Sequence, residues 1–438
     1  MSKTEAARAT RRHFLKTASS GVLAAAAAST LGIARSAHAA GSGTIKIGLV
    51  GCGGRGSGAA VNAMNAGKDI KLVAMADVFS EYLQGARKRL KAEKPDQVDV
   101  ADDHCFVGFD AYQKLIASGV DVVLLGATSH FHPIHLKAAI DAGKHVFCEK
   151  PHGVDVPGLK MAMEAAEQAK EKGLSLVSGL CWRYDPGVRE AMKRIADGAI
   201  GDIVTIQETY ITSPYGLRER RPEWNEMQYQ LQNWYHFNWL SGDQTGQQLI
   251  HSIDKSSWAL GDKPPQKAWG TGGRQVCTEP KYGDQFDHFA VVFEYESGVR
   301  VFGFCRDQLG CYNETTDMIF GTKGRAFLPS RPRIEGETKW VYKATEPVSM
   351  YDAEHAALFA SIRAGKPLNN SNYMFTSTML AILAQMVCYT GQEITWQEAM
   401  QSKLVLAPSR YAWDAEPPVK PDKNGQYPCP MPGITKFV

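Results

Sequence analysis

Ile45-Lys-Ile-Gly-Leu-Val-Gly-Cys-Gly-Gly-Arg-Gly56 is the stretch that decides the fold. A strand-like apolar run is followed by three glycines with the G-x-G-x-x-G spacing of a dinucleotide-binding turn: Gly51, Gly53 and Gly56. In such a turn the first glycine permits the bend, the second lets the backbone approach a pyrophosphate, and the third lets the helix pack on the strand. Gly54 and Arg55 open that helix, whose free N–H groups and positive dipole end attract phosphates.

The strand-like run 70–76 supplies the second part of such a unit. It ends in Asp77, at the distance from Gly56 where a dinucleotide-binding fold carries the carboxylate that accepts ribose hydroxyls. A carboxylate there disfavours a 2′-phosphate, so we expect NAD as the cofactor, with NADP the less favoured choice. The alternative is that Asp77 is an ordinary turn residue after a strand.

Residues 1–39 have the features of an export signal rather than of a folded domain. Thr10-Arg-Arg-His-Phe-Leu-Lys16 is a twin-arginine sequence, and an alanine-rich stretch over 21–33 leads to Ala37-His-Ala39 as a cleavage site. The stretch is too short and too weakly apolar to span a membrane, so we expect no stable membrane anchor. We expect export by the twin-arginine machinery to the periplasm or the extracellular space. An unprocessed N-terminal tail is the alternative.

The composition and length limit the classes of protein to which this chain can belong. A net charge of +3 is too small for a nucleic-acid-binding surface, and the remaining length of about 400 residues favours two domains. The nine cysteines form no C-x-x-C pair, so no metal site is expected. Their odd number leaves at least one thiol free, and only Cys305 and Cys311 are close enough in sequence to suggest a disulfide.

Residues 40–180 alternate apolar strands with helical patterns, which predicts a Rossmann domain with a parallel sheet. The strand 120–126 ends in a polar segment that contains Thr128 and His132. A short strand after Gly143 then brings Glu149 and Lys150 to the same carboxyl edge, where open α/β folds bind ligands. A lysine in a partly desolvated pocket can hydrogen-bond to a substrate hydroxyl or carbonyl, or exchange a proton with it. Without that context, Glu-Lys-Pro would be a surface turn.

These motifs together resemble the glucose-fructose oxidoreductase / inositol dehydrogenase / MocA family (Gfo/Idh/MocA), over nearly the whole chain after residue 39. The resemblance implies an N-terminal Rossmann domain followed by an α/β domain built on a large, mostly antiparallel sheet, an overall fold class of α/β plus α+β. We expect this second domain, which binds substrate and mediates oligomerisation, over residues 181–400. It implies NAD(P) on the first domain and a sugar or polyol between the two. It also implies that Thr128, His132 and Glu149 flank the nicotinamide half of the cofactor, and that Lys150 reaches the substrate. Arg183 resembles a family position near cofactor or substrate.

An aromatic insertion over 215–239 suggests a carbohydrate site. Aromatic faces stack on the C–H faces of sugar rings, which makes three consecutive residues candidate substrate contacts: Trp234, Tyr235 and His236. Such clusters are equally common in cores and in oligomer contacts, and the sequence leaves both readings open.

The run 246–261 predicts a helix on which Gln247, His251 and Asp254 share a face. By resemblance to the family, this helix supplies an aspartate and, four residues on, a histidine that acts as general base. His251 and Asp254 match the family pattern, but Gln247 stands where the family has the carboxylate. Glutamine can bind a sugar but cannot raise the basicity of His251, so binding is expected and ordinary alcohol oxidation is in question.

The rest of the chain predicts strands from residue 286 and two amphipathic helices within 351–391 that resemble the family's closing helices and could pack back on the Rossmann domain. The free face of the broad sheet is expected to mediate a homo-oligomer. Residues 401–438 are rich in proline and predict an extended tail, lying on a neighbouring subunit or on its own domain.

The leading hypothesis is an NAD(P)-dependent oxidoreductase acting on a sugar, sugar derivative or cyclitol, with catalysis by Lys150, His251 and Gln247 and a tightly bound, internally recycled cofactor. The alternative is an NAD-dependent glycosidase or lyase working through transient oxidation at C3. A third possibility is a binding protein on a degenerate dehydrogenase fold.

Overall fold

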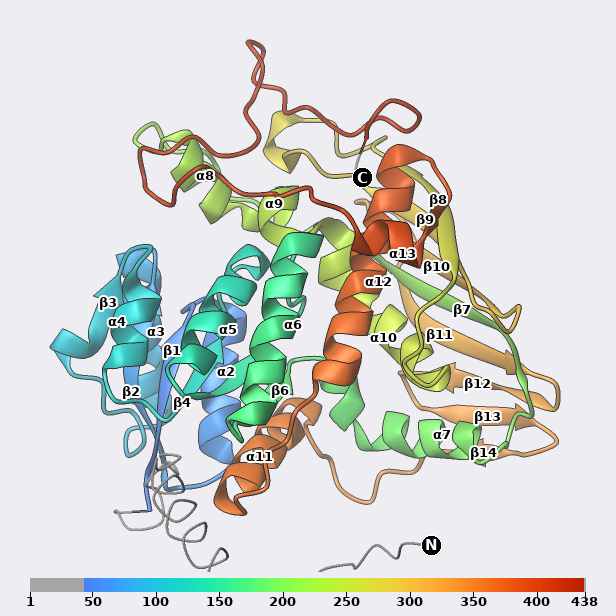
Figure 1. Cartoon of the computed structure of the whole chain (residues 1–438), viewed down its shortest axis with the longest axis horizontal. Helices are drawn as coiled ribbons and strands as arrows, with labels where there is room; N and C mark the ends of the chain where they lie inside the picture. The colour runs from blue at the N-terminus through green and yellow to red at the C-terminus, as the bar shows by residue number, and fades with distance from the viewer. Residues whose placement is uncertain (1–42, 437–438) are drawn as a thin grey trace, which may run out of the picture. The chain divides into compact units, whose positions relative to one another are not determined.

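The computed structural model describes residues 43–436 (Figure 1). The export signal expected over 1–39 therefore lies outside the described residues.

The first part of the chain forms a parallel sheet of six strands in the order β3-β2-β1-β4-β5-β6. Its strands are β1 (Ile45–Val50), β2 (Ile70–Asp77), β3 (Cys105–Val107), β4 (Val122–Leu125), β5 (His145–Cys148) and β6 (Leu176–Ser178). The helices that follow them are α2 (Gly54–Asn65), α3 (Ser80–Glu93), α4 (Ala111–Ala117), α5 (His132–Asp141) and α6 (Val156–Glu171). Because β1 pairs with both β2 and β4, the chain changes direction across the sheet at the end of β1, where such sheets bind ligands.

The second part forms a sheet of nine strands in the order β14-β13-β12-β11-β7-β10-β9-β8-β15. Its strands are β7 (Ile203–Thr212), β8 (Lys267–Gly273), β9 (His288–Glu294), β10 (Arg300–Asp307), β11 (Glu314–Gly321), β12 (Gly324–Leu328), β13 (Arg333–Gly336), β14 (Trp340–Val341) and β15 (Ile394–Thr395). Only the pairing of β7 with β10 is parallel. The predicted fold class is confirmed.

The helices after β6 pack on the second sheet or against the Rossmann part. They are α7 (Pro186–Ala196), α8 (Glu226–Gln232), α9 (Asn238–Ser241), α10 (Ile250–Ala259), α11 (Met350–Arg363), α12 (Ser371–Thr390) and α13 (Trp396–Met400). The closing helices do contact the Rossmann part: α11 packs on α2, and α12 stands between α6 and β8 (Figure 1). Among the described residues, α12 alone is long and apolar enough to cross a membrane, but it is almost wholly buried as a core helix.

The C-terminal tail packs on its own chain rather than projecting away from it. Trp413 contacts Phe79 and Phe109 of the Rossmann part, and Tyr427 packs on Phe237 of the second part. Figure 1 shows the tail, in dark red, running across α8 and α9. The tail therefore contacts both domains of its own chain, and its contact with a neighbouring subunit stays a prediction.

All nine cysteines are free thiols. Cys305 is buried on β10 while Cys311 is exposed, so the suggested bridge between them is not formed.

Candidate active site

The glycine turn has the geometry that a dinucleotide requires. Gly51 has φ +90°, and a Cβ at Gly56 would lie 1.9 Å from the carbonyl oxygen of Gly51. These two glycines are therefore needed by the fold itself. Gly53 differs, because it caps α2 with an ordinary φ of −67° and a Cβ there would meet no atom within 4 Å. The empty space beside Gly53 and Gly54, at the start of α2, fits a pyrophosphate that binds the backbone closely.

Asp77 is held at the end of β2 by two backbone groups. The N–H of Cys52 donates to its Oδ2 at 2.7 Å and that of Phe79 to its Oδ1 at 2.9 Å. Burial raises the pKa of this carboxyl from its ordinary value, while the two N–H donors act in the opposite direction. Each carboxylate oxygen keeps a further acceptor site for a ribose hydroxyl.

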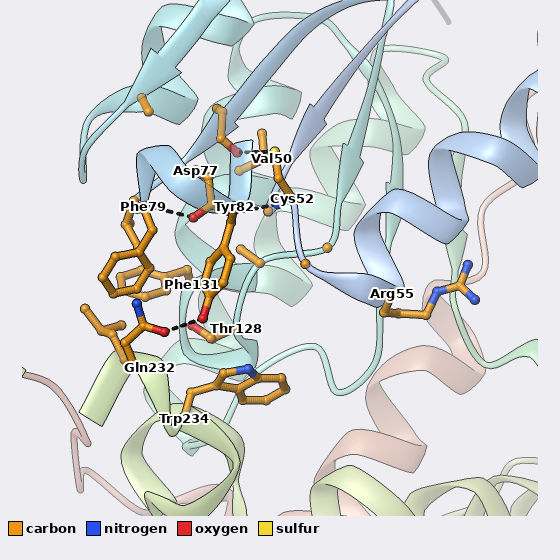
Figure 2. Close-up of a pocket in the computed structure, with 18 of the residues that line it drawn as sticks. Val50, Cys52, Arg55, Asp77, Phe79, Tyr82, Thr128, Phe131, Gln232 and Trp234 are labelled. Carbon is orange, nitrogen blue, oxygen red and sulfur yellow. Dashed lines mark hydrogen bonds between the residues drawn. The ribbon is translucent and has the colours of Figure 1, made fainter. Parts of the chain in front are cut away.

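A cavity of about 600 Å³ connects these two features, within the range of small-molecule and cofactor sites (Figure 2). Predicted site residues that line it are Gly51, Gly53, Gly54, Arg55, Asp77, Thr128, Trp234 and Tyr235. Among the residues that the structure describes, the buried hydroxyl of Thr128 has no hydrogen-bond partner, so it offers an unused polar group at the wall. The cavity therefore has a phosphate cradle, a ribose acceptor and an aromatic end.

Arg55 does not aim its side chain at the cradle. Its Nε lies 2.8 Å from Oε1 of Glu149, and its guanidinium sits 4.6 Å above the ring of Tyr351. Figure 2 shows this side chain directed away from the other labelled residues. Arg55 thus ties the start of α2 to the end of β5, and it is one of the residues that line the cavity.

Lys150 is fixed by a backbone oxygen of the second domain. Its Nζ donates to the carbonyl of Gln247 at 2.6 Å. That carbonyl belongs to a π-helical turn, Thr245–Leu249, directly before α10, and π turns often occur at functional sites. Burial lowers the pKa of Lys150, an effect that the neighbouring Glu149 partly opposes.

His251 lies in the first turn of α10, after the π turn. Its ring stacks on Tyr210 with centroids 6.2 Å apart, and Nδ1 has no hydrogen-bond partner in the described part of the chain. Burial lowers the pKa of His251 well below its ordinary value, and the positive charges of Lys150 and Lys255 lower it further. The imidazole is therefore neutral near pH 7 and able to accept a proton.

The side chain of Gln247 is buried and hydrogen-bonds to groups of the protein itself. Its Nε2 donates to Oγ of Ser129 at 2.9 Å and to the carbonyl of Ser241. The helix expected over 246–261 is interrupted at this residue by the π turn. These contacts give Gln247 a positioning role between the two domains, and its direct contact with substrate stays a prediction.

Arg183 and Asp254 form a structural ion cluster outside the cavity. Arg183 lies 2.9 Å from Asp254 and 2.6 Å from Asp262, and its guanidinium stacks over Tyr373 at 4.2 Å. Burial alone would lower the pKa of Arg183, but the two carboxylates raise it above its ordinary value. The charges of Arg183, Asp254 and Asp262 compensate one another in this cluster, and the contacts of Arg183 with cofactor and of Asp254 with substrate stay predictions.

Two predicted histidines are also buried away from the cavity. Both ring nitrogens of His132 lie within 2.9 Å of backbone carbonyls, those of Pro151 and Ala127. His236 packs against Tyr282. Burial lowers the pKa of each to about 4, so both are neutral. In these contacts His132 connects the end of β4 to the end of β5.

The insertion builds an aromatic wall at the end of the cavity. Tyr235 lies between two rings, with Trp234 at 3.7 Å and Tyr215 at 3.8 Å between centroids. Trp234 and Tyr235 line the cavity, and Tyr235 lies near Glu149, whose charge adds to the effect of burial in raising the Tyr235 pKa.

Sequence reasoning missed the residues that surround Asp77 in three dimensions. They come from the start of α3 and the residue before it, from the loops after β3 and β4, and from the insertion: Phe79, Tyr82, Phe109, Phe131, Arg218 and Gln232. The only sequence feature that pointed to these residues was the high content of aromatic residues in the segments that contain them.

Comparison with known proteins agrees with this architecture. Residues 45–179 match the family described as "Oxidoreductase family, NAD-binding Rossmann fold", and residues 188–327 match the "GFO/IDH/MocA C-terminal domain". Inositol 2-dehydrogenase of Salmonella paratyphi B is 26% identical over 335 residues, which cover 74% of this chain and 88% of that protein.

Solved structures share the fold at lower identity. Aldose-aldose oxidoreductase from Caulobacter crescentus superimposes with a TM-score of 0.65 at 17% identity, covering 80% of this chain and 99% of that one. Scyllo-inositol dehydrogenase from Lactobacillus casei, with bound NAD(H) and scyllo-inositol, gives 0.61 at 22% identity, covering 81% and 99%. The chain belongs to the Gfo/Idh/MocA family of oxidoreductases, whose first domain is an NAD-binding Rossmann fold.

Proposed function

We propose that this protein is an NAD-dependent oxidoreductase that acts on a ring hydroxyl of a sugar, sugar derivative or cyclitol. The observation that carries the proposal is the junction of Lys150, the Gln247 carbonyl and His251. It joins the carboxyl edge of the Rossmann sheet, which also holds the glycine turn, to the start of α10 in the second domain.

In this arrangement the protein supplies one hydrogen-bond donor and one base. Lys150, held by the Gln247 carbonyl, can donate a hydrogen bond to the substrate oxygen. Neutral His251 can take the hydroxyl proton as that carbon is oxidised. Bound NAD supplies the hydride acceptor at C4 of its nicotinamide. The aromatic wall of Trp234 and Tyr235 is suited to the C–H face of the ring.

The proposed export route implies that the cofactor stays bound to the protein. Free NAD(H) is a cytoplasmic metabolite, so an enzyme exported in the folded state would need to keep its nucleotide and recycle it within the site. One substrate would be oxidised and a second substrate, or a later intermediate, would be reduced. Replacing both Arg11 and Arg12 by lysine should retain the protein in the cytoplasm, and fractionation of the two forms would test this.

The decisive experiment adds a panel of sugars, cyclitols and glycosides to the purified protein without added nucleotide. A change of absorbance at 340 nm with one of them, together with an oxidised product by mass analysis, is the expected result. His251→Ala should retain its nucleotide and lose turnover by about 10²-fold or more. Unchanged turnover in that variant would refute the assignment of the base.

The same residues could serve a glycosidase or lyase that oxidises C3 only transiently, which acidifies the C2 proton. Release of free aglycone and exchange of the C2 proton for deuterium, without net NADH, would favour this second function. An oxidised sugar as the final product would exclude it.

A further inference from the structure

We propose that two segments of this chain, residues 213–239 and 404–427, form a clasp over the adenosine end of the NAD site, so that NAD leaves only when the clasp opens. The proposal rests on the NAD site of the proposed function and adds the residues that retain the nucleotide. Asp77 marks the adenosine end, because it is the acceptor for the ribose hydroxyls.

The first half of the clasp closes onto α3. The hydroxyl of Tyr82 donates to Oε1 of Gln232, and Nε2 of Gln232 donates to Oε1 of Glu81 at 3.2 Å. The guanidinium of Arg218 lies 5.0 Å above the ring of Tyr82. Figure 2 shows the contact between Tyr82 and Gln232 below Asp77. All four residues line the cavity, so these contacts form part of its wall.

The second half comes from the C-terminal tail. The ring of Trp413 packs on Phe109 and Phe79, with centroids 4.8 Å and 5.3 Å apart. Both phenylalanines line the cavity near Asp77. Tyr411 extends the contact, because its hydroxyl lies 2.8 Å from Nε2 of His130. The tail therefore supports the adenosine wall from behind.

The two halves are also bonded to each other. Asn225 donates to the carbonyl of Trp413 at 2.7 Å, and Gln230 donates to the carbonyl of Val419 at 2.8 Å. Arg220 reaches the hydroxyl of Tyr427 at 3.0 Å. Because the tail holds the insertion and both contact the Rossmann part, opening the site means breaking several contacts together. This coupling slows release rather than changing the chemistry at Lys150 and His251.

NADH release from the loaded protein tests the proposal. Bound NADH is chased with excess NAD, and the loss of its fluorescence gives the dissociation rate. Trp413→Ala should accelerate release by about tenfold or more, because its two aromatic contacts together correspond to such a factor. Arg410→Ala is the matched control, since Arg410 lies in the same tail and its ion pair within the described part of the chain is with exposed Asp414. It should change the rate by less than about twofold, because exposed ion pairs contribute little.

Release from folded Trp413→Ala at the wild-type rate would overturn the clasp. Hydrogen exchange of the wild-type chain gives a second readout that needs no variant. NADH should slow exchange in both 213–239 and 404–427, and identical exchange with and without NADH would also overturn the proposal. A chain that binds no NADH would instead refute the proposed function.

Discussion

At the scale of single residues, the site contains a histidine that burial keeps neutral and side chains that hydrogen bonds hold in place. His251 is neutral because burial and two nearby ammonium groups disfavour its charged form. Gln247 contributes its carbonyl to Lys150 and its amide to Ser129, so one residue connects both domains. A carboxylate at position 247 would carry a charge to this interface, whereas the amide carries none.

The hydrogen bond between Gln247 and Ser129 should be measurable as a coupling energy. Gln247→Leu and Ser129→Ala, alone and together, form a double-mutant cycle. We expect a coupling of about 0.5–1.5 kcal/mol in the free energy of unfolding, the usual net value of one such bond. Urea denaturation of the four proteins gives the value, and strict additivity would show that the bond contributes nothing.

A second residue-scale prediction concerns Glu208, which is fully buried opposite Asp317 on the neighbouring strand. Burial, with a smaller effect of the Asp317 charge, raises the pKa of Glu208 to about 8. Between its unfolded pKa near 4.5 and about 8, the folded chain therefore binds one more proton than the unfolded chain. This group accordingly lowers stability as pH rises, by about 1.4 kcal/mol per pH unit in that window.

Glu208→Gln mimics the protonated acid and should remove that slope. The free energy of unfolding of this variant should equal that of the wild type near pH 5. The difference in favour of the variant should grow towards pH 8. Urea midpoints at the two pH values provide the measurement. A difference from wild type that does not depend on pH would contradict the raised pKa.

At the scale of elements, the turn between β1 and α2 contains glycines that are needed for two different reasons. Gly56 is required by packing, because its Cα faces the Gly51 carbonyl, whereas the space beside Gly53 is open. The π turn before α10 is the other specialised element, since it places the Gln247 carbonyl at Lys150.

Gly53→Ala and Gly56→Ala should therefore impair different properties, the first nucleotide binding and the second stability. Gly56→Ala should lower the free energy of unfolding by about 1–3 kcal/mol, because its Cβ overlaps backbone. Gly53→Ala should keep the stability of the nucleotide-free protein, since its φ suits alanine, and should lose bound NAD. Thermal unfolding and nucleotide content by chromatography distinguish the two. Normal NAD content in Gly53→Ala would place the pyrophosphate elsewhere.

At the scale of the whole molecule, no helix of residues 43–436 covers the outer face of the second sheet. A row of half-exposed, mostly apolar side chains crosses six neighbouring strands on that face: Trp269, Val292, Phe302, Gln207, Met318 and Phe327. The alternation of β10, with Val301 and Cys305 buried and Phe304 39% exposed, shows that the row is the outer face of the sheet. We propose that a second copy of the chain covers it.

Phe302→Glu should then reduce the oligomer mass measured by light scattering, because a charge in the middle of an apolar interface is costly to bury. Tyr312→Glu is the control, since Tyr312 is 71% exposed in the loop after β10. A wild-type chain that is monomeric at micromolar concentration would rule out the interface.

The sequence by itself determined the Rossmann fold, its NAD site and the family. Those features depend on local spacing, since the glycine turn, Asp77 and the strand before Lys150 are each encoded within a few residues. It also named Lys150 and His251 as candidates, because Lys150 comes shortly after a strand and His251 lies in a helix that the sequence pattern predicts. It did not determine how Gln247 and Arg183 are oriented, since an amide or guanidinium takes its direction from partners distant in the chain, here Ser129, Asp254 and Asp262. Only the tertiary structure decided the wall around Asp77, because Tyr82 meets Gln232 and Phe79 meets Trp413 through packing between segments that no local pattern connects.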